Sequence, residues 1–133
     1  MIKKRDILKF IKNEQTAYLG NVVENKAKVR AMTTTFYKNH FWLATKKERA
    51  KTEQLKKNKD VEICYSNEKG SLRASGELEF INDKEKRNEL SKVISFFDAY
   101  WSSPEDEDFI LLKLIPESVI IHDFKKGKFI TYS

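Results

Sequence analysis

The residues best suited to chemistry lie where a predicted strand passes into a basic helix. The strand ends in Ala44 and Thr45, and a helix predicted over residues 46–59 carries Lys46 and Lys51 in its first part. Backbone N–H groups at a helix start, a threonine hydroxyl and lysine ammonium groups are the donors and charges that bind a phosphate. The segment therefore predicts an anion site, although a solvated basic helix has the same composition.

The distribution of charge also favours an anionic ligand. The chain of 133 residues has a net charge of +6, with 16 basic and 6 acidic residues in positions 1–60 against 10 and 14 in positions 61–133. A field of that sign attracts a nucleic acid, a phosphorylated small molecule or an anionic membrane. Charge alone does not choose among these ligands.

Composition narrows the classes of protein to which the chain can belong. No apolar run approaches the roughly 20 residues of a membrane helix, and the charged N-terminus is not followed by an apolar export signal. We therefore expect a cytoplasmic protein without a membrane partner. The single cysteine, Cys64, belongs to no C-x-x-C pattern, so no metal site is expected.

The pattern of apolar residues predicts one mainly β (α+β) domain over residues 1–133. Strand composition recurs over residues 16–23, 27–36, 40–45, 61–65, 71–81, 109–114, 119–124 and 129–132. Because closure is the usual way in which such a sheet avoids exposed edges, we predict a six-stranded antiparallel β-barrel with peripheral helices.

Turns and breaks are expected between several of these strands. Turns are predicted at Glu24–Lys26 and Lys38–Asn39, and Pro116–Glu117 is expected to separate two of the closing strands. Gly76 lies inside a strand pattern and indicates a bulge or a close approach of two backbones.

Two further helices are predicted at the periphery. One covers residues 3–13, and the other follows Asn82, which forms a capping box with Glu85. The second helix is expected to extend to Phe97. Its apolar face comprises Leu90, Val93, Ile94 and Phe97.

Five short motifs occur in a fixed order along the chain. They are Thr16–Gly20, Val29–Thr33, Leu43–Thr45 with Lys51, Leu55 and Asn58, Val61–Tyr65, and Arg73–Glu77. Their order resembles the pyridoxamine 5′-phosphate oxidase-like FMN-binding split-barrel family, in particular its general-stress-protein branch. The resemblance extends from about residue 7 to residue 123.

The resemblance implies flavin contacts along one strand. Arg30 matches an arginine that reaches the FMN phosphate in the family. The backbone of the three residues that follow, Ala31, Met32 and Thr33, would then hydrogen-bond the pyrimidine edge of the isoalloxazine ring.

A second group of contacts is implied at the phosphate and ribityl end. Ala44, Thr45 and Lys51 match the family's Ala-Thr pair and its downstream lysine, and Lys46 is a weaker addition. These are the residues that the local chemistry already indicates as an anion site.

Two aromatic positions are candidates for the ring end. His122 falls where many relatives have an aromatic residue against the flavin of the other subunit, and Trp101 would form a wall of the substrate pocket. A partly exposed structural histidine and a core tryptophan are the alternatives.

The resemblance implies an FMN-binding homodimer, with the flavin between the subunits, that acts as an NAD(P)H-linked oxidoreductase on an unknown substrate. In the oxidase itself a lysine stands five residues after the arginine, whereas here that residue is Thr35. Oxidation of pyridoxamine 5′-phosphate is therefore not expected.

Other functions remain open from the sequence. The chain could bind flavin without turnover as a stress protein, and related split barrels hold haem or a deazaflavin. A weaker alternative is a basic barrel that binds nucleic acid. Its stacking residues would be Tyr18, Phe36, Tyr37 and Trp42.

Overall fold

Two tight hairpins build the first half of the sheet in the computed structural model, which describes residues 4–132. Strands β1 (Glu14–Val23) and β2 (Lys26–Tyr37) are joined by Glu24 and Asn25, and β2 is joined to β3 (His40–Lys46) by Lys38 and Asn39. All four linking residues have positive φ, between 49° and 64°. Two consecutive residues of this kind suit the twist of a hairpin, and both predicted turns are confirmed.

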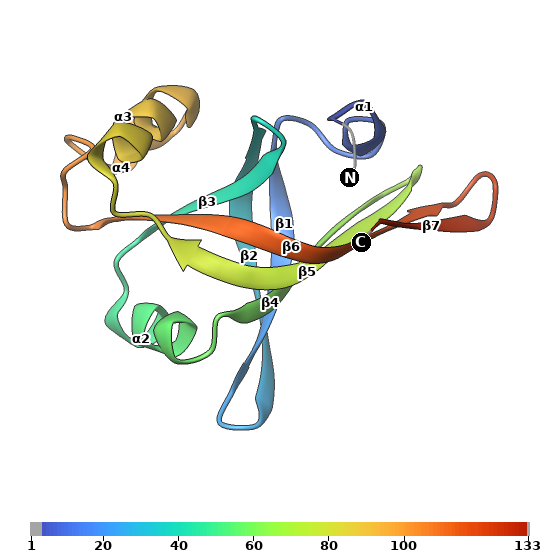
Figure 1. The fold of residues 1–133 in the computed structure, drawn as a ribbon, viewed down its shortest axis with the longest axis horizontal. Helices are drawn as coiled ribbons and strands as arrows, with labels where there is room; N and C mark the ends of the chain where they lie inside the picture. Colours follow the sequence, from blue (N-terminus) through green and yellow to red (C-terminus); the bar gives the residue numbers. More distant parts are fainter. Residues whose placement is uncertain (1–3, 133) are drawn as a thin grey trace.

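Three more strands close the sheet into a barrel (Figure 1). These are β4 (Asp60–Asn67), β5 (Gly70–Phe80) and β6 (Phe109–Asp123), and the sheet has the order β3-β2-β1-β4-β5-β6 with β6 pairing back onto β3. Strand β7 (Lys128–Tyr132) pairs with the far half of β6, outside the barrel. The predicted six-stranded antiparallel barrel is therefore confirmed, with one strand added.

The closing strand corrects one prediction. Residues 109–123 form a single strand, so the expected break at Pro116–Glu117 is wrong. The β5–β6 register shifts between Ser75 and Gly76, and Gly76 faces Pro116 there. A bulge accommodates a residue that lacks an N–H donor, and the bulge predicted at Gly76 is confirmed.

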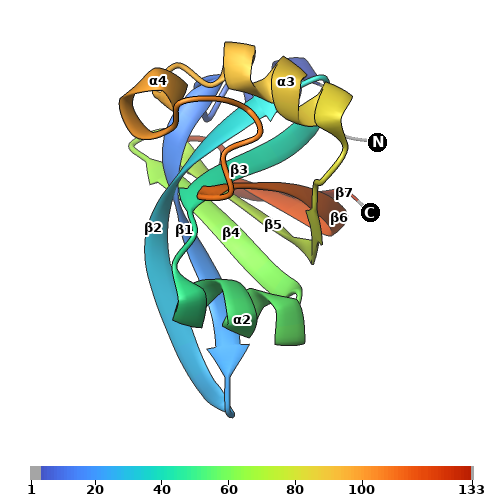
Figure 2. The ribbon, with the colours of Figure 1, turned by 90° about the vertical axis from the view of Figure 1, so that its left-hand side faces the viewer.

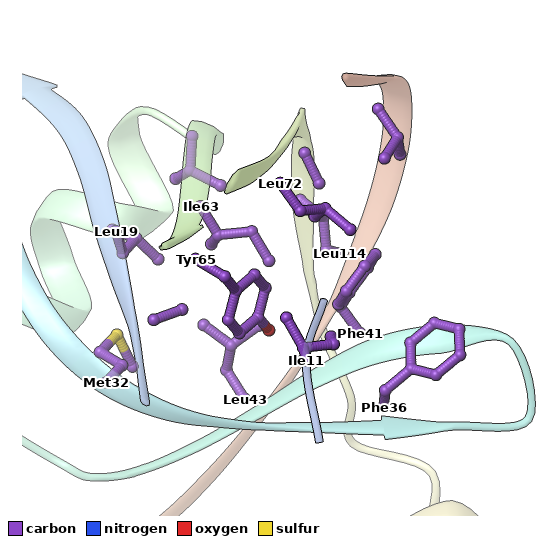
Figure 3. Packing of buried hydrophobic residues seen from close by; sticks show 14 of the residues in the cluster. Ile11, Leu19, Met32, Phe36, Phe41, Leu43, Ile63, Tyr65, Leu72 and Leu114 are labelled. Atoms are coloured by element: carbon purple, nitrogen blue, oxygen red, sulfur yellow. The ribbon is translucent and has the colours of Figure 1, made fainter. Parts of the chain in front are cut away.

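Alternate residues of the strands fill the barrel (Figure 3). Leu19, Leu43, Ile63 and Leu114 are fully buried around Tyr65. The Tyr65 hydroxyl shares a short hydrogen bond with Thr34 Oγ1, which satisfies its polar group inside the core. Burial raises the pKa of Tyr65 above its ordinary value, so the phenol stays neutral.

The first two helices are shorter than predicted. Helix α1 spans Lys4–Ile7 instead of 3–13, and residue 3 lies outside the described part. Helix α2 spans Arg49–Lys57, because Lys46 still belongs to β3. None of the described helices is long and apolar enough to cross a membrane.

The third predicted helix is two helices. Helix α3 spans Lys84–Val93 and α4 spans Phe97–Tyr100, and both lie at the end of the barrel opposite α2 (Figure 2). The N-cap of α3 is Asp83, whose side chain accepts a hydrogen bond from the backbone N–H of Glu85 at 3.3 Å. The capping box expected from Asn82 is therefore wrong by one residue.

An ionic contact anchors α3 to the barrel. The Glu89 carboxylate accepts hydrogen bonds from Lys38 Nζ at 2.6 Å and from the Tyr37 hydroxyl at 2.7 Å. These two bonds lower the pKa of Glu89 to about 2, and the bond from Lys38 has the larger effect. The contact joins α3 to the β2–β3 turn and so helps to place the residues that follow α3.

We predict that Gly76→Ala destabilises the barrel by about 1–3 kcal/mol. A Cβ atom at Gly76 would overlap the carbonyl oxygen of Ile115, which is backbone and cannot move aside easily. Gly20→Ala is the matched control, because its Cβ atom would meet only ordinary contacts at 3.8 and 3.9 Å. Urea unfolding measures both variants, and equal free energies of unfolding would contradict the close approach at Gly76.

Candidate functional site

The barrel is split along one side of β2. This strand pairs with β1 from Lys26 to Thr35, but with β3 only from Thr34 to Tyr37. Strand β3 pairs instead with β6 along Phe41–Lys46. In the described part of the chain, every second residue of 26–33 therefore presents unpaired backbone N–H and C=O groups on the side where β3 diverges.

The split opens into a cavity of about 820 Å³. That volume lies within the range of roughly 300–1,000 Å³ that is typical of small-molecule sites. Every site residue predicted from the sequence lines this cavity except His122. Residues from β2, β3, α2 and α4, far apart in the sequence, thus converge on one space.

One end of the cavity is cationic. Arg30 Nη2 donates a hydrogen bond to Gln54 Oε1 on α2 at 3.2 Å. Lys51 Nζ, also on α2, donates to Thr45 Oγ1 at 2.6 Å. Helix α2 therefore holds both cations in place, one from β2 and one of its own.

The partners of Lys51 leave most of its charge uncompensated. Its side chain is only 13% exposed, and the nearest recorded carboxylate is that of Glu48 at 3.7 Å, which is 69% exposed and well solvated. Glu48 is the N-cap of α2, yet its side chain makes no capping hydrogen bond. A mostly buried cation beside an uncapped helix start favours an anionic ligand.

The other end of the cavity is aromatic. Trp101 lines it but is only 4% exposed, and its indole N–H donates to the carbonyl of Asp108 at 3.0 Å. The ring packs on Phe97 and Phe109. Trp101 is therefore the buried support of the wall, whereas Tyr100, 54% exposed, presents its surface.

His122 lies away from this cavity. Its ring stacks on Phe129 of β7, with centroids 3.9 Å apart and an interplanar angle of 18°. The contact predicted for His122 concerns the flavin of a second subunit, so it stays a prediction.

Six residues that line the cavity were not predicted as site residues from the sequence: Glu14, Lys28, Val29, Glu48, Phe96 and Tyr100. Lys28 could have been found, because it precedes Arg30 by two residues and shares its side of the strand. Glu14 and Phe96 come from segments 82 residues apart, and no local pattern links them.

A second groove of about 770 Å³ lies between α3 and the acidic loop before β6. Its arginine, Arg87, already donates to the carbonyl oxygens of Pro104 at 2.9 Å and Asp106 at 3.2 Å. Its guanidinium also lies 4.6 Å from the centre of the Phe109 ring. Arg87 therefore holds the loop and is not free to bind a ligand.

The structure also bears on the nucleic-acid alternative. Of the proposed stacking residues, Phe36 and Trp42 are buried in the two hydrophobic clusters, and the Trp42 indole donates to the carbonyl of Tyr37. Buried rings cannot stack on bases. The described surface thus lacks the row of aromatic side chains that this alternative requires.

Comparison with known proteins identifies the family. A family model described as pyridoxamine 5′-phosphate oxidase like matches residues 3–133. The chain belongs to this family. A search of curated proteins finds no match.

Several solved structures of this barrel are similar to the chain. A nimc/nima family protein from Clostridium acetobutylicum gives a TM-score of 0.82 at 22% identity, over 96% of this chain and 90% of that one. General Stress Protein 26 from Bacillus anthracis gives a TM-score of 0.76 at 18% identity, over 97% of this chain and 98% of that one. A pyridoxamine 5′-phosphate oxidase-related, FMN binding protein from Nostoc punctiforme gives a TM-score of 0.69 at 18% identity, over 88% of this chain and 85% of that one. These likenesses show a shared fold.

We predict that inorganic phosphate raises the melting temperature through the cationic end of the cavity. An anion that binds only the folded protein adds about 2.7 kcal/mol when it is present at a hundred times its Kd. Most of this shift should disappear in the Arg30→Gln/Lys51→Gln double variant. Lys56→Gln is the control, because Lys56 is an exposed lysine on the same helix. An equal shift in all three proteins would show that the cavity is no anion site.

Proposed function

We propose that this member of the pyridoxamine 5′-phosphate oxidase-like family binds FMN non-covalently in the split of the barrel. The observation that carries the proposal is the convergence of Arg30, Thr45 and Lys51 at one end of a cavity that also has an open strand edge. The FMN binding protein from Nostoc punctiforme, which shares the fold, supports the same cofactor.

The residues of the cavity match the parts of the cofactor. Arg30 and Lys51 bind the phosphate through charge-assisted hydrogen bonds, and the Thr45 hydroxyl contributes another polar contact. The open strand edge along residues 31–33 binds the polar edge of the ring, and the Met32 side chain, nearly buried, forms part of the floor. The excess of positive charge in residues 1–60 favours a reduced, negatively charged flavin.

We further propose an oxidoreductase that takes electrons from NAD(P)H. The flavin, when bound, supplies the hydride and electron chemistry, and the protein supplies binding and orientation. Steady-state NAD(P)H oxidation with varied acceptors distinguishes this activity from flavin storage, since a storage protein would show negligible rates.

Pyridoxamine 5′-phosphate remains an unexpected substrate. The residue five positions after Arg30, where the oxidase has a lysine, is Thr35, which is uncharged and 5% exposed inside the sheet. Thr35 can supply neither a positive charge nor an accessible donor to a phosphorylated substrate.

We predict that Arg30→Gln and Lys51→Gln each weaken FMN binding. Loss of one charge-assisted hydrogen bond costs about 1.5–3 kcal/mol, which is roughly a tenfold to hundredfold rise in Kd. Quenching of FMN fluorescence measures Kd, and Lys56→Gln serves again as the control. A purified wild type that is colourless and takes up no added FMN would overturn the cofactor assignment.

We also propose a homodimer, because the outer face of β1 and β2 carries a strip of exposed apolar side chains. This apolar strip consists of Tyr18, Val22 and Val29, which are 56%, 46% and 72% exposed. The register places Gly20 opposite Val29, so no large side chain interrupts the strip there. Exposed apolar patches mark protein interfaces. Val29 also lines the cavity, so a second subunit on the strip would border the flavin.

The prediction for the dimer is that Tyr18→Glu produces a monomer. A charge in the middle of an apolar interface must be desolvated without a partner, which costs several kcal/mol. Ile115→Glu is the control, because Ile115 is also exposed, at 41%, but lies on β6 outside the strip. Light scattering in the presence of FMN measures the mass, and a monomeric wild type would contradict the proposal.

A further inference from the structure

The aromatic end of the cavity has features that the binding of FMN does not use. We define the aromatic corner as Phe96, Tyr100 and Trp101, which surround the short helix α4. The Phe96 and Tyr100 rings meet edge to face with centroids 6.0 Å apart, and the Tyr100 and Trp101 centroids are 5.6 Å apart. Three aromatic rings in mutual contact form a stiff apolar surface.

The corner stands on a rigid base. Trp101 packs on Phe109 with centroids 4.9 Å apart, and Phe97 meets the same Phe109 ring edge to face, also at 4.9 Å. The indole N–H is already bonded to the Asp108 carbonyl. The Trp101 side chain therefore has no donor left for a ligand and acts as support for Tyr100 and Phe96.

A contact between distant segments holds the corner at the mouth of the split. The Glu14 carboxylate, at the start of β1, accepts a hydrogen bond from the Ser95 hydroxyl at 2.5 Å and another from the Ser95 backbone N–H at 3.2 Å. We call this pair the Glu14–Ser95 clasp. Ser95 directly precedes Phe96, and Glu14 itself lines the cavity. The clasp therefore ties the aromatic corner to the sheet that carries the flavin anchors.

A lysine ammonium lies beside the exposed ring. Lys46 Nζ lies 5.9 Å from the centre of the Tyr100 ring, a distance typical of a cation–π contact. The same ammonium lies 3.8 Å from the Asp108 carboxylate. Its charge is thus partly compensated, and Asp108 would repel a ligand group of high negative charge.

We propose that the aromatic corner is a subsite for a second ligand, a planar aromatic compound that carries no more than one negative charge. The inference rests on the proposed function, in which Arg30 and Lys51 are occupied by the FMN phosphate. At the corner, Tyr100, Phe96 and the ammonium of Lys46 then remain for the second ligand. Flat rings stack on such a surface, and a carboxylate matches one shared ammonium better than a doubly charged phosphate does.

The test uses three probes on the FMN-loaded protein: 2-naphthoate, 2-naphthyl phosphate and decalin-2-carboxylate. Isothermal titration should show the tightest binding for 2-naphthoate. Decalin-2-carboxylate has the same charge but no aromatic ring, so its weaker binding would isolate stacking. Naphthyl phosphate keeps the ring but adds charge, so its weaker binding would isolate the preference for a monoanion.

Variants assign the binding to the corner. Tyr100→Leu should weaken 2-naphthoate binding about threefold to tenfold, and Tyr100→Phe should retain most of it. Phe124→Leu, at an exposed aromatic residue that directly follows β6 and does not line the cavity, is the control and should have no effect. Ser95→Ala, which removes one bond of the clasp, should weaken 2-naphthoate while leaving the Kd of FMN unchanged.

Several results would overturn the subsite. They are equal binding of 2-naphthoate and decalin-2-carboxylate, tighter binding of naphthyl phosphate, or an equal effect of Tyr100→Leu and Phe124→Leu. A loss of FMN affinity in Tyr100→Leu that matches the loss for 2-naphthoate would assign the corner to the flavin instead. If the protein takes up no FMN, the proposed function fails, whereas dependence of 2-naphthoate binding on Tyr100 in the flavin-free protein would still support the subsite.

Discussion

The divergence of β3 from β2 is the constraint on which the site depends. A closed barrel pairs every strand on both sides, but β2 loses its partner on one side before Thr34 because β3 turns away to pair with β6. Unpaired backbone groups must bond to something, and here they border a cavity. The split thus supplies both the space for a ligand and a row of donors and acceptors along it.

The rest of the barrel is extensively paired and packed around this gap. The pairs of β5 with β6 and of β1 with β2 run over most of their lengths, and the core around Tyr65 lies within the paired part. Helix α2 follows β3 directly and spans the region next to the split, where it bonds Arg30 through Gln54. At the opposite end, α3 and α4 add a second hydrophobic cluster that supports the aromatic wall. A rigid frame with an unpaired strand edge beside a cavity is suited to binding, because little order has to be created when a ligand enters.

Local sequence patterns predict local structure well and distant contacts poorly. The hairpin turns could be predicted because Asn25 and Asn39 tolerate a left-handed backbone, and the pairing of Thr45 with Lys51 because these residues lie close together in the sequence. The continuity of β6 could not be predicted from the local sequence, since Pro116 is tolerated only through the bulge opposite Gly76 on another strand. The aromatic corner likewise depends on a helix break after Val93 and on a contact between residues 14 and 95, and no sequence periodicity predicts either feature.

The most direct measurement is a crystal structure of the protein grown with FMN. We expect the FMN phosphate within hydrogen-bond distance of the Arg30 guanidinium and the Lys51 ammonium, with the ring along the unpaired edge of β2. A flavin bound elsewhere, or one whose phosphate faces solvent while both cations keep their bonds to Gln54 and Thr45, would contradict this expectation.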